Sequence, residues 1–247
     1  MAFASAGVMV LSATLLVIFW VTEQKFAPRT ERGGVIQSLK IAGRNRMFLS
    51  VLLITLLAQF SVMTIEPVLP LYIVEIGGSV KDASLLSGII FSLLGIASIL
   101  FAPRWGNLAD RIGFRKVLII GLLFGGLGNI AQILFHSIWG FSIVRFIYGA
   151  FFCAVFPAIN GLVVQSTPSE FRGRAFGINQ TANQIGGMLG PIAGGLISGV
   201  FSIHSIFWIT GFILLFAMVV AFQSYSKDDF ANPSKNNPAK TTAAGES

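Results

Sequence analysis

The sequence predicts an all-α integral membrane protein, and its composition is the first observation that does so. Of its 247 residues, 54% are hydrophobic and only 11% are charged, which is the wrong balance for the surface of a water-soluble domain. The second observation is a set of windows with almost no charge, each close to the roughly 20 apolar residues that a membrane-spanning helix needs. Seven such windows lie at residues 3–22, 48–74, 84–103, 117–135, 139–165, 175–199 and 206–223.

The spans differ in length and in how they are interrupted. Residues 48–74 and 139–165 are longer than a straight crossing needs, which suits tilted or bent helices. Pro67, Pro70 and Pro157 lie inside them, and proline is tolerated in membrane helices. The last two spans are separated by the turn signal SGVFSIHS, residues 198–205.

The distribution of basic residues predicts how the chain is oriented in the membrane. Connections on one side carry Lys25, Arg29, Arg32, Lys40, Arg44, Arg46, Arg104, Arg111, Arg115, Lys116, Arg172, Arg174, Lys227, Lys235 and Lys240. The opposite side has only Lys81, balanced by Glu75 and Asp82. The positive-inside rule therefore places the N-terminus outside and the C-terminus in the cytoplasm. The net charge of +7 is a topology signal, so no nucleic-acid partner is expected.

The spans and connections divide the chain into four segments. Residues 1–22 are expected to form a transmembrane helix; a signal peptide does not fit, because the bases follow this span instead of preceding it. Residues 23–46 form a basic cytoplasmic linker, residues 47–225 a bundle of six transmembrane helices, and residues 226–247 a polar tail that we expect to be disordered. This pattern is typical of one helix left from an earlier bundle, followed by a linker and a complete bundle.

The chemistry-bearing residues argue against an enzyme. The single cysteine, Cys153, falls within an apolar span, which excludes a disulfide within the chain and a thiolate metal cluster. The two histidines, His136 and His204, lie near outer turns of different spans. No HExxH, GxSxG, Walker-type or paired-cysteine pattern occurs. We therefore expect no catalytic residue, no metal site and no cofactor.

A compact charged segment, GNLADRIGFRK from Gly106 to Lys116, separates the spans at 84–103 and 117–135. One interpretation is a simple cytoplasmic turn, which the bases hold inside and which Gly106 and Gly113 allow to reverse tightly. The spacing is more specific than that interpretation requires. The pattern G-x-L-x-D-R-x-G-x-R-K-x-L, residues 106–118, resembles the cytoplasmic signature loop of the major facilitator superfamily. It lies between the second and third helices of the six-helix block, as the resemblance requires.

Two further segments resemble motifs of the same superfamily, in the same order. RFIYGAFFCA fits its fourth-helix pattern Arg-x-x-Gln-Gly at Arg145 and Gly149, with Tyr148 in place of the glutamine. GGMLGPIAGG resembles its antiporter signature, Gly-x-x-x-Gly-Pro-x-x-Gly-Gly, through Gly186, Gly190, Pro191, Gly194 and Gly195. The segments SVMTIEPVLPLYIVEIGG and TPSEFRGRAFGINQTANQIGG look most like the drug:proton antiporters, the bacterial multidrug efflux pumps.

The resemblance implies an architecture, a location and a set of partners. It makes the six-helix block similar to the C-terminal half of such a transporter, helices seven to twelve, with residues 3–22 standing for helix six. The antiporter signature is chiefly a feature of the fifth helix, so its place in the eleventh is a departure that leaves the reverse assignment of the halves open. The implied protein is a multi-pass plasma-membrane protein that uses the proton gradient and no cofactor. Its implied partners are membrane lipid, a small-molecule substrate and an N-terminal six-helix half, in trans or missing by truncation.

The resemblance also assigns a gating role to the signature residues, which are Gly106, Asp110, Arg111, Gly113, Arg115 and Lys116. In the family the loop aspartate joins a charge relay with a neighbouring arginine and with a helix terminus of the other half. Asp110 is therefore expected to pair with Arg111 or Arg115 and to act as a gate latch. A helix N-terminus favours a nearby carboxylate by about 0.3–1 kcal/mol, which biases a gate when several such contacts act together.

Two charged residues inside spans are candidates for the proton or substrate pathway. Glu66 is the only acid inside a span, and a carboxyl group buried in a membrane tends to be functional. The alternative is a helix-break residue that reaches water beside Pro67. Arg145 lies about two turns, ~9 Å, from the outer end of its span. It either snorkels outward or, as the resemblance favours, points inward.

The span at 175–199 carries two stripes of small residues. One consists of Ala182, Gly186, Gly190, Gly194 and Ser198, and beside it lie Gly187, Pro191, Gly195 and Gly199. Spacing of four residues lets another helix backbone approach closely. Plain helix packing and a special role in controlling ion leak are both open, and they are compatible because close packing itself seals a pathway.

The same span begins with an amide face, formed by Asn179, Gln180, Asn183 and Gln184. Asn183 is expected roughly 13 Å from the cytoplasmic end, close to the midplane where such transporters bind substrate. Together with Gln59, these amides are candidates for lining a cavity; the competing interpretation is hydrogen bonding between helices. Asn129 and Gln132 are weaker candidates.

The function that this resemblance favours is proton-coupled efflux of hydrophobic or cationic drugs by alternating access, with this chain as the C-terminal half. A facilitator-family carrier of a sugar or other metabolite, or an inactive truncated fragment, is the alternative, because function lies in the cavity side chains. A seven-helix receptor would share the topology but would not explain three ordered motifs. A rhodopsin needs a lysine in its last helix, and residues 206–223 contain none.

Overall fold

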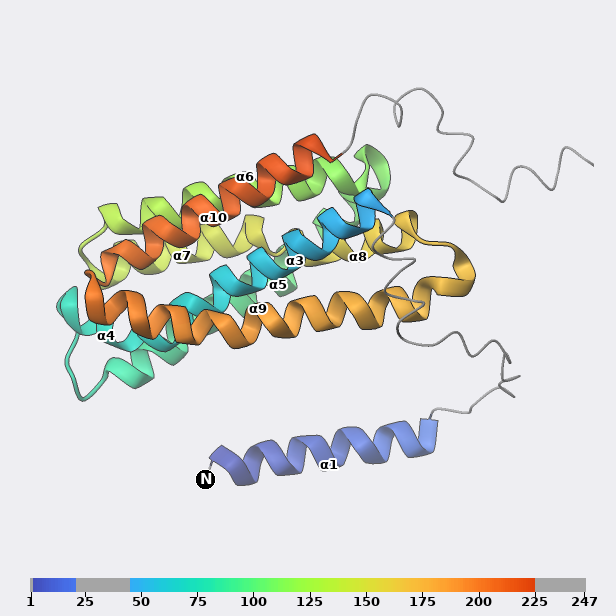
Figure 1. The fold of residues 1–247 in the computed structure, drawn as a ribbon. Helices are drawn as coiled ribbons and strands as arrows, with labels where there is room; N and C mark the ends of the chain where they lie inside the picture. Colours follow the sequence, from blue (N-terminus) through green and yellow to red (C-terminus); the bar gives the residue numbers. More distant parts are fainter. Residues whose placement is uncertain (1, 21–44, 225–247) are drawn as a thin grey trace, which may run out of the picture. The chain divides into compact units, whose positions relative to one another are not determined.

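The computed structural model describes residues 2–20 and 45–224, which are helical and contain no strand within those ranges (Figure 1). The chain divides into two units, Met1–Val35 and Ile36–Ser247, and each is described by itself. The predicted linker, apart from its last two residues, and the predicted tail at 226–247 lie outside the described residues.

The first unit contains helix α1, Ala2–Trp20, which coincides with the span predicted at 3–22. From Gly7 to Trp20 the helix is apolar, and the side chains of this stretch are exposed within the unit.

The second unit is a helical bundle in which six predicted spans can be recognised. Its elements are α3 (Arg46–Ile65), η1 (Glu66–Val68), α4 (Leu69–Glu75), α5 (Ala83–Ile112), α6 (Phe114–Ala131), η2 (Gln132–Leu134), α7 (Ile138–Phe152), α8 (Val155–Ser166), η3 (Ser169–Phe171), α9 (Arg172–Val200) and α10 (His204–Gln223). Five segments in the described part of the chain are long and apolar enough to cross a membrane: Arg46–Glu75, Ala83–Ile112, Phe114–Leu134, Ile138–Ser166 and His204–Gln223. Helix α9 has the length of a span but more polar residues.

Proline accounts for the interruptions inside two of these spans. Proline cannot donate the backbone hydrogen bond to the carbonyl group four residues earlier. The break between α7 and α8 falls at Cys153 and Ala154, and Cys153 is four residues before Pro157. Likewise, α3 passes into the short 3₁₀ turn η1 at Glu66, between Ile65 and Pro67. The prolines therefore bend these spans, as the sequence predicts.

The bundle is built around one long contact between α3 and α9, with α10 packed on both α6 and α3. Figure 1 shows α9 running along α3, and α10 running along α6. Outward surfaces are apolar: α5 exposes Leu85 and Ile99, and α10 exposes Phe212 and Phe216. Exposed apolar rows of this kind suit contact with lipid, so the prediction of an all-α membrane protein is confirmed.

Candidate functional site

The charged signature segment is helical almost throughout, so the prediction of a loop is wrong. Gly106 and Asp110 lie in the last turns of α5, and α6 begins at Phe114. Only Gly113 leaves the helix: its φ of 95° lies in the region that favours glycine. A Cβ added at Gly106 would meet nothing within 4 Å, so the reversal depends on Gly113 and not on Gly106.

The predicted pairing of Asp110 with Arg111 or Arg115 stays a prediction. The ion pair found among the described residues joins His204 and Glu75, and Asp110 is exposed. Arg115 instead donates from Nη2 to the carbonyl oxygen of Phe222, 2.7 Å away, and its guanidinium lies 5.8 Å from the Phe222 ring centroid. Because cations favour helix C-termini, Arg115 fastens the end of α10 to the start of α6.

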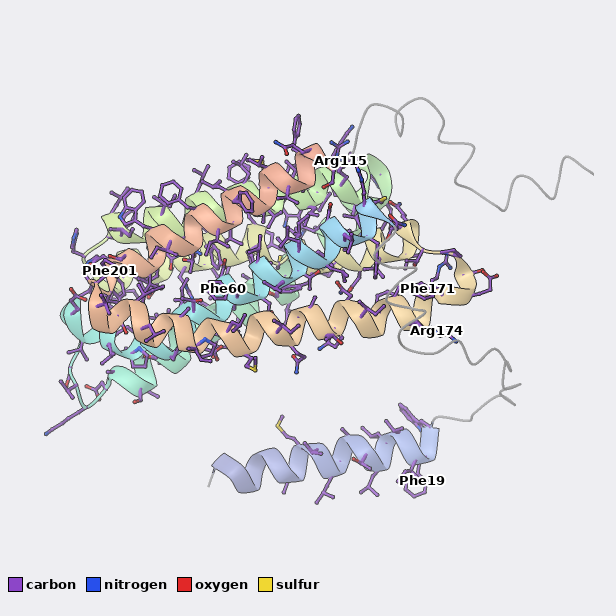
Figure 2. All side chains as sticks on the ribbon, viewed as in Figure 1. Phe19, Phe60, Arg115, Phe171, Arg174 and Phe201 are labelled. Carbon is purple, nitrogen blue, oxygen red and sulfur yellow. The ribbon has the colours of Figure 1, made fainter. Side chains whose placement is uncertain are left out.

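This contact marks one end of the bundle. Figure 2 shows Arg115, Phe171 and Arg174 at that end and Phe201 at the other. In the predicted topology, the end with Arg115 is the cytoplasmic one. Arg111 and Lys116 are exposed there too, which fits the signature segment as a cytoplasmic feature.

Arg145 is buried inside the bundle, with only 2% of its surface exposed. Its Nη1 donates to Gln132 Oε1 at 2.9 Å, and Gln132 Nε2 donates to Asn129 Oδ1 at 3.0 Å. Asn129 Nδ2 donates to Thr210 Oγ1 at 3.3 Å, and Thr210 donates in turn to the Ile206 carbonyl at 2.7 Å. The chain of donors thus joins α7, η2, α6 and α10.

The network places Arg145 inward and not at a water-facing end. Its guanidinium carbon lies 5.5 Å from the Tyr148 ring centroid, while its Nε has no hydrogen-bond partner within the described residues. A buried charge is costly without a counter-charge. Within the described residues, no carboxylate lies at ion-pair distance from Arg145.

Glu66 opens the 3₁₀ turn η1, at the point where the first span of the bundle is interrupted. Its side chain is partly exposed, and prolines follow at positions 67 and 70. This agrees with a carboxylate at a helix break. Whether Glu66 carries protons stays a prediction.

The other fourth-helix motif residue, Gly149, permits close packing. A Cβ at Gly149 would lie 3.2 Å from Ala97 Cβ and 3.3 Å from Leu94 Cα, both on α5. The glycine therefore lets α7 and α5 approach each other.

The amide candidates divide between a helix contact and an open surface. Thr55 Oγ1 donates to Asn179 Oδ1 at 2.8 Å, and Asn183 Nδ2 lies 3.5 Å from Gln59 Oε1. These two bonds join α3 and α9, which is the competing interpretation for Asn179, Asn183 and Gln59. Gln180 and Gln184 are exposed, so they remain candidates for a cavity wall.

The first small-residue stripe packs directly on α3, as the spacing predicts. A Cβ added at Gly186 would lie 2.4 Å from the carbonyl oxygen of Leu56, and one added at Gly190 would lie 2.6 Å from Met63 Cβ. A Cβ added at Gly194 would lie 2.3 Å from the carbonyl oxygen of Thr64. We call this buried row, Ala182, Gly186, Gly190 and Gly194, the seam.

The second stripe leaves the bundle along its length: a Cβ at Gly187 would still lie 3.8 Å from Gln59 Cγ, but the residues that follow point away. Pro191 is exposed, and a Cβ at Gly195 or Gly199 would meet nothing within 4 Å. We call the exposed side of α9 the open face; it includes Gln180, Gln184, Pro191, Gly195 and Gly199, with exposed apolar residues such as Met188 and Ile192 among them.

Two polar residues of this arrangement could not be predicted from the sequence. Thr210, which ends the Arg145 network, and Thr55, which holds Asn179, are threonines inside apolar spans. A hydroxyl group that bonds back to its own helix gives no periodic signal, so nothing local marks either residue as a partner. Among the described residues, no group of three His, Cys, Asp or Glu side chains could hold a metal ion.

Membrane-spanning helices that are broken by proline, with a charge buried between them and side-chain amides exposed on one helix, are typical of membrane transport proteins. The chain belongs to the Major Facilitator Superfamily, whose family model matches residues 51–245. It is a multi-pass protein of the plasma membrane.

Similarity to individual proteins supports this assignment. The chain is 33% identical over 223 residues to "Multidrug resistance protein MdtG" of Salmonella arizonae, covering 88% of this chain and 54% of the relative. The protein of the same name from Salmonella paratyphi B is 33% identical over 220 residues, with 87% and 54% covered. The chain thus spans about half the length of the curated relatives it matches.

A solved structure shows the same fold. A crystal structure of the peptide transporter POT in complex with sulfate superimposes with a TM-score of 0.61 and 18% sequence identity. The match covers 84% of this chain and 46% of that one, so the fold found here corresponds to about half of the solved transporter.

Proposed function

We propose that this chain forms the C-terminal half of a transporter that exports hydrophobic or cationic drugs by alternating access. The observation that carries the proposal is the open face of α9. Gln180 and Gln184 are exposed on it, beside exposed apolar side chains such as Met188 and Ile192. Side-chain amides in contact with hydrocarbon are costly, and polar groups in membrane segments generally face a cavity or another part of the protein. The open face is therefore suited to a water-filled pathway.

The missing wall of that pathway would come from an N-terminal six-helix half. The two halves of this superfamily are related by an axis along the membrane normal, and substrate binds between them near the midplane. A chain that covers 54% of its relatives supplies one wall only. The proposed topology has the N-terminus outside and the C-terminus inside, with residues 1–22, 23–46, 47–225 and 226–247 as helix, linker, bundle and tail. The transporter makes and breaks no covalent bond, and it needs no cofactor.

The proposed substrates follow from the relatives and from Glu66. The relatives are named for multidrug resistance, and a carboxylate at the break of a span provides a site for a proton or a cationic drug. Coupling to the proton gradient would then use Glu66, and Arg145, buried between the helices, is the second charged candidate for the pathway. Asp110, exposed at the cytoplasmic end, is proposed to latch the gate against the other half.

The test is the accumulation of a fluorescent cationic drug in efflux-deficient bacteria. One culture expresses this chain alone, and a second expresses it joined to the N-terminal half of a related exporter. We expect lower accumulation only with the joined protein, and a protonophore should abolish the difference. Export by the chain alone would refute the half-transporter proposal. An unchanged level in both cultures, with both proteins present in the membrane, would favour a metabolite carrier or an inactive fragment.

The role of Glu66 is tested in the joined protein by Glu66→Gln, which keeps the size of the side chain and removes its charge. We expect loss of drug-induced proton flux into membrane vesicles. Asp82→Asn is the matched control, because Asp82 is an exposed acid outside the spans. Proton flux that survives in Glu66→Gln would remove Glu66 from the coupling pathway.

A further inference from the structure

Both histidines of the chain come together at the end of the bundle opposite Arg115. His136 lies in the connection between η2 and α7, and His204 is the first residue of α10. Their ring centroids are 6.4 Å apart, although 68 positions separate the two numbers in the sequence. In the proposed topology this is the outer end, where the side chains meet the external pH.

His204 is linked to the last residue of α4. Its Nδ1 lies 3.5 Å from Glu75 Oε1, with 27% and 42% of the two side chains exposed, respectively. The pair therefore connects the end of the first span of the bundle to the beginning of the last one.

The helix ends make this pair mutually supporting. An acid is unfavourable at the C-terminus of its own helix, and a cation is unfavourable at the N-terminus of its own helix. Glu75 ends α4 and His204 begins α10, so each charged group is misplaced on its own helix. Each lies beside the end of the other helix that favours it. A charged His204 thus depends on Glu75.

Around Glu75 and His204, the contacts between α4 and α10 are mostly apolar, so the ion pair is the main polar connection between these two helices. The apolar side chains beneath the pair pack together in one buried cluster, which includes Val68, Leu69, Ile206 and Phe207. Tyr72 lies against the His204 ring at a centroid distance of 5.5 Å, and its buried hydroxyl group has no partner within the described residues.

From these contacts we infer that Glu75 and His204 form a pH-sensitive clamp at the outer end of the bundle. The titratable groups that surround His204 are Glu75 and Tyr72 on α4 and His136 before α7. Lys81 and Asp82, in the connection after α4, are exposed and make no ion pair within the described residues. The clamp fixes α4, which follows the 3₁₀ turn that carries Glu66.

The sign of the pH dependence follows from the charges. Histidine side chains ordinarily change charge near pH ~6.5. A cationic His204 attracts the Glu75 carboxylate, so the clamp is closed when the ring is protonated. A neutral His204 does not attract the carboxylate in this way, so the clamp is open when the ring is neutral. A second charge on His136 would oppose the clamp from 6.4 Å away, so His136 tunes the clamp without forming it.

The test uses the purified full chain in detergent micelles, without substrate, at pH 5.5 and pH 8.0. The midpoint of thermal unfolding is measured for the wild type, His204→Asn, Glu75→Gln and the double variant. Asparagine places an amide near the position of Nδ1 but stays neutral. We expect each single change to lower the midpoint by about 2–4 °C at pH 5.5, with no difference at pH 8.0. The double variant should lose no more than either single one, because the two residues act as a pair.

Hydrogen exchange gives a second readout that does not depend on global unfolding. After correction for intrinsic rates, the amides of residues 72–78 should exchange several-fold more slowly at pH 5.5 than at pH 8.0 in the wild type. That difference should vanish in His204→Asn and persist in the control His136→Asn. Equal pH dependence in the wild type and His204→Asn, or additive losses in the double variant, would overturn the clamp. Because no transport is measured, these results are independent of the proposed drug export.

Discussion

Glycine lies on both faces of α9, in opposite surroundings. On the seam, glycine brings the backbone of α9 so close to α3 that an added methyl group at Gly194 would lie 2.3 Å from a carbonyl oxygen. On the open face, one residue further along, the same methyl group at Gly195 would touch nothing within 4 Å. The same residue type at the same spacing therefore marks a helix contact in one case and an unfilled surface in the other.

The polar residues of α9 follow the same division. Asn179, on the buried side, is held by Thr55, whereas Gln180 and Gln184 are exposed. The seam is thus complete within this chain, and the open face is not. One side of α9 therefore holds the bundle together, and the proposed function places the transport pathway on the other side.

The largest effect should come from adding one methyl group to each face. Gly194→Ala forces the Thr64 carbonyl away from α9, so we expect a loss of about 1–3 kcal/mol in the free energy of unfolding. Gly195→Ala is the matched control and should leave stability unchanged or raise it by up to about 1 kcal/mol, because alanine favours helix. Denaturant unfolding of the purified chain in micelles measures both. Equal effects of the two changes would show that α3 and α9 do not pack as described.

Sequence patterns predict the positions of the spans and the seam because both depend on composition and spacing. The same patterns mark Arg145, Asn129 and Gln132 as candidate pathway residues, but they do not predict that these side chains are hydrogen-bonded to one another. The connection depends on how α6, α7 and α10 are rotated against one another, and local sequence does not fix that rotation. Thr210 completes the network for this reason alone.

In the signature segment, the sequence pattern predicts the wrong local structure. Its glycines predict a turn, yet Gly106 continues α5 and only Gly113 turns the chain. Glycine lowers helix propensity by about 1 kcal/mol relative to alanine, which the packing of a long span overrides. The partner of Arg115, a backbone carbonyl at the end of α10, leaves no trace in the pattern, because any residue supplies a carbonyl group.

A smaller effect on stability is expected when a threonine between α3 and α9 is replaced, compared with a threonine on the exposed side of α9. Thr55→Val removes the donor to Asn179 Oδ1 in the seam region, and we expect a loss of about 0.5–1.5 kcal/mol in stability. Thr181→Val is the matched control, since Thr181 is exposed and donates only to Gly177 on its own helix. The same unfolding measurement applies. If Thr181→Val costs as much as Thr55→Val, the bond between α3 and α9 contributes nothing of its own.

The smallest effect on stability, and the most informative one for function, is expected on the open face. Gln184→Leu removes an exposed amide that contacts no other helix in the described structure, so the stability of the chain alone should change by less than about 0.5 kcal/mol. In the protein joined to an N-terminal half, the same change should reduce drug export, because the amide would border the pathway. The control is Leu196→Gln, which adds an amide at an exposed apolar position of α9. It tests whether export responds to the polarity of this surface in general or to the amide of Gln184 in particular. If Gln184→Leu does not affect export, the open face contacts protein and does not border the pathway. The seam would still be the contact that holds the bundle together, because this change does not touch it.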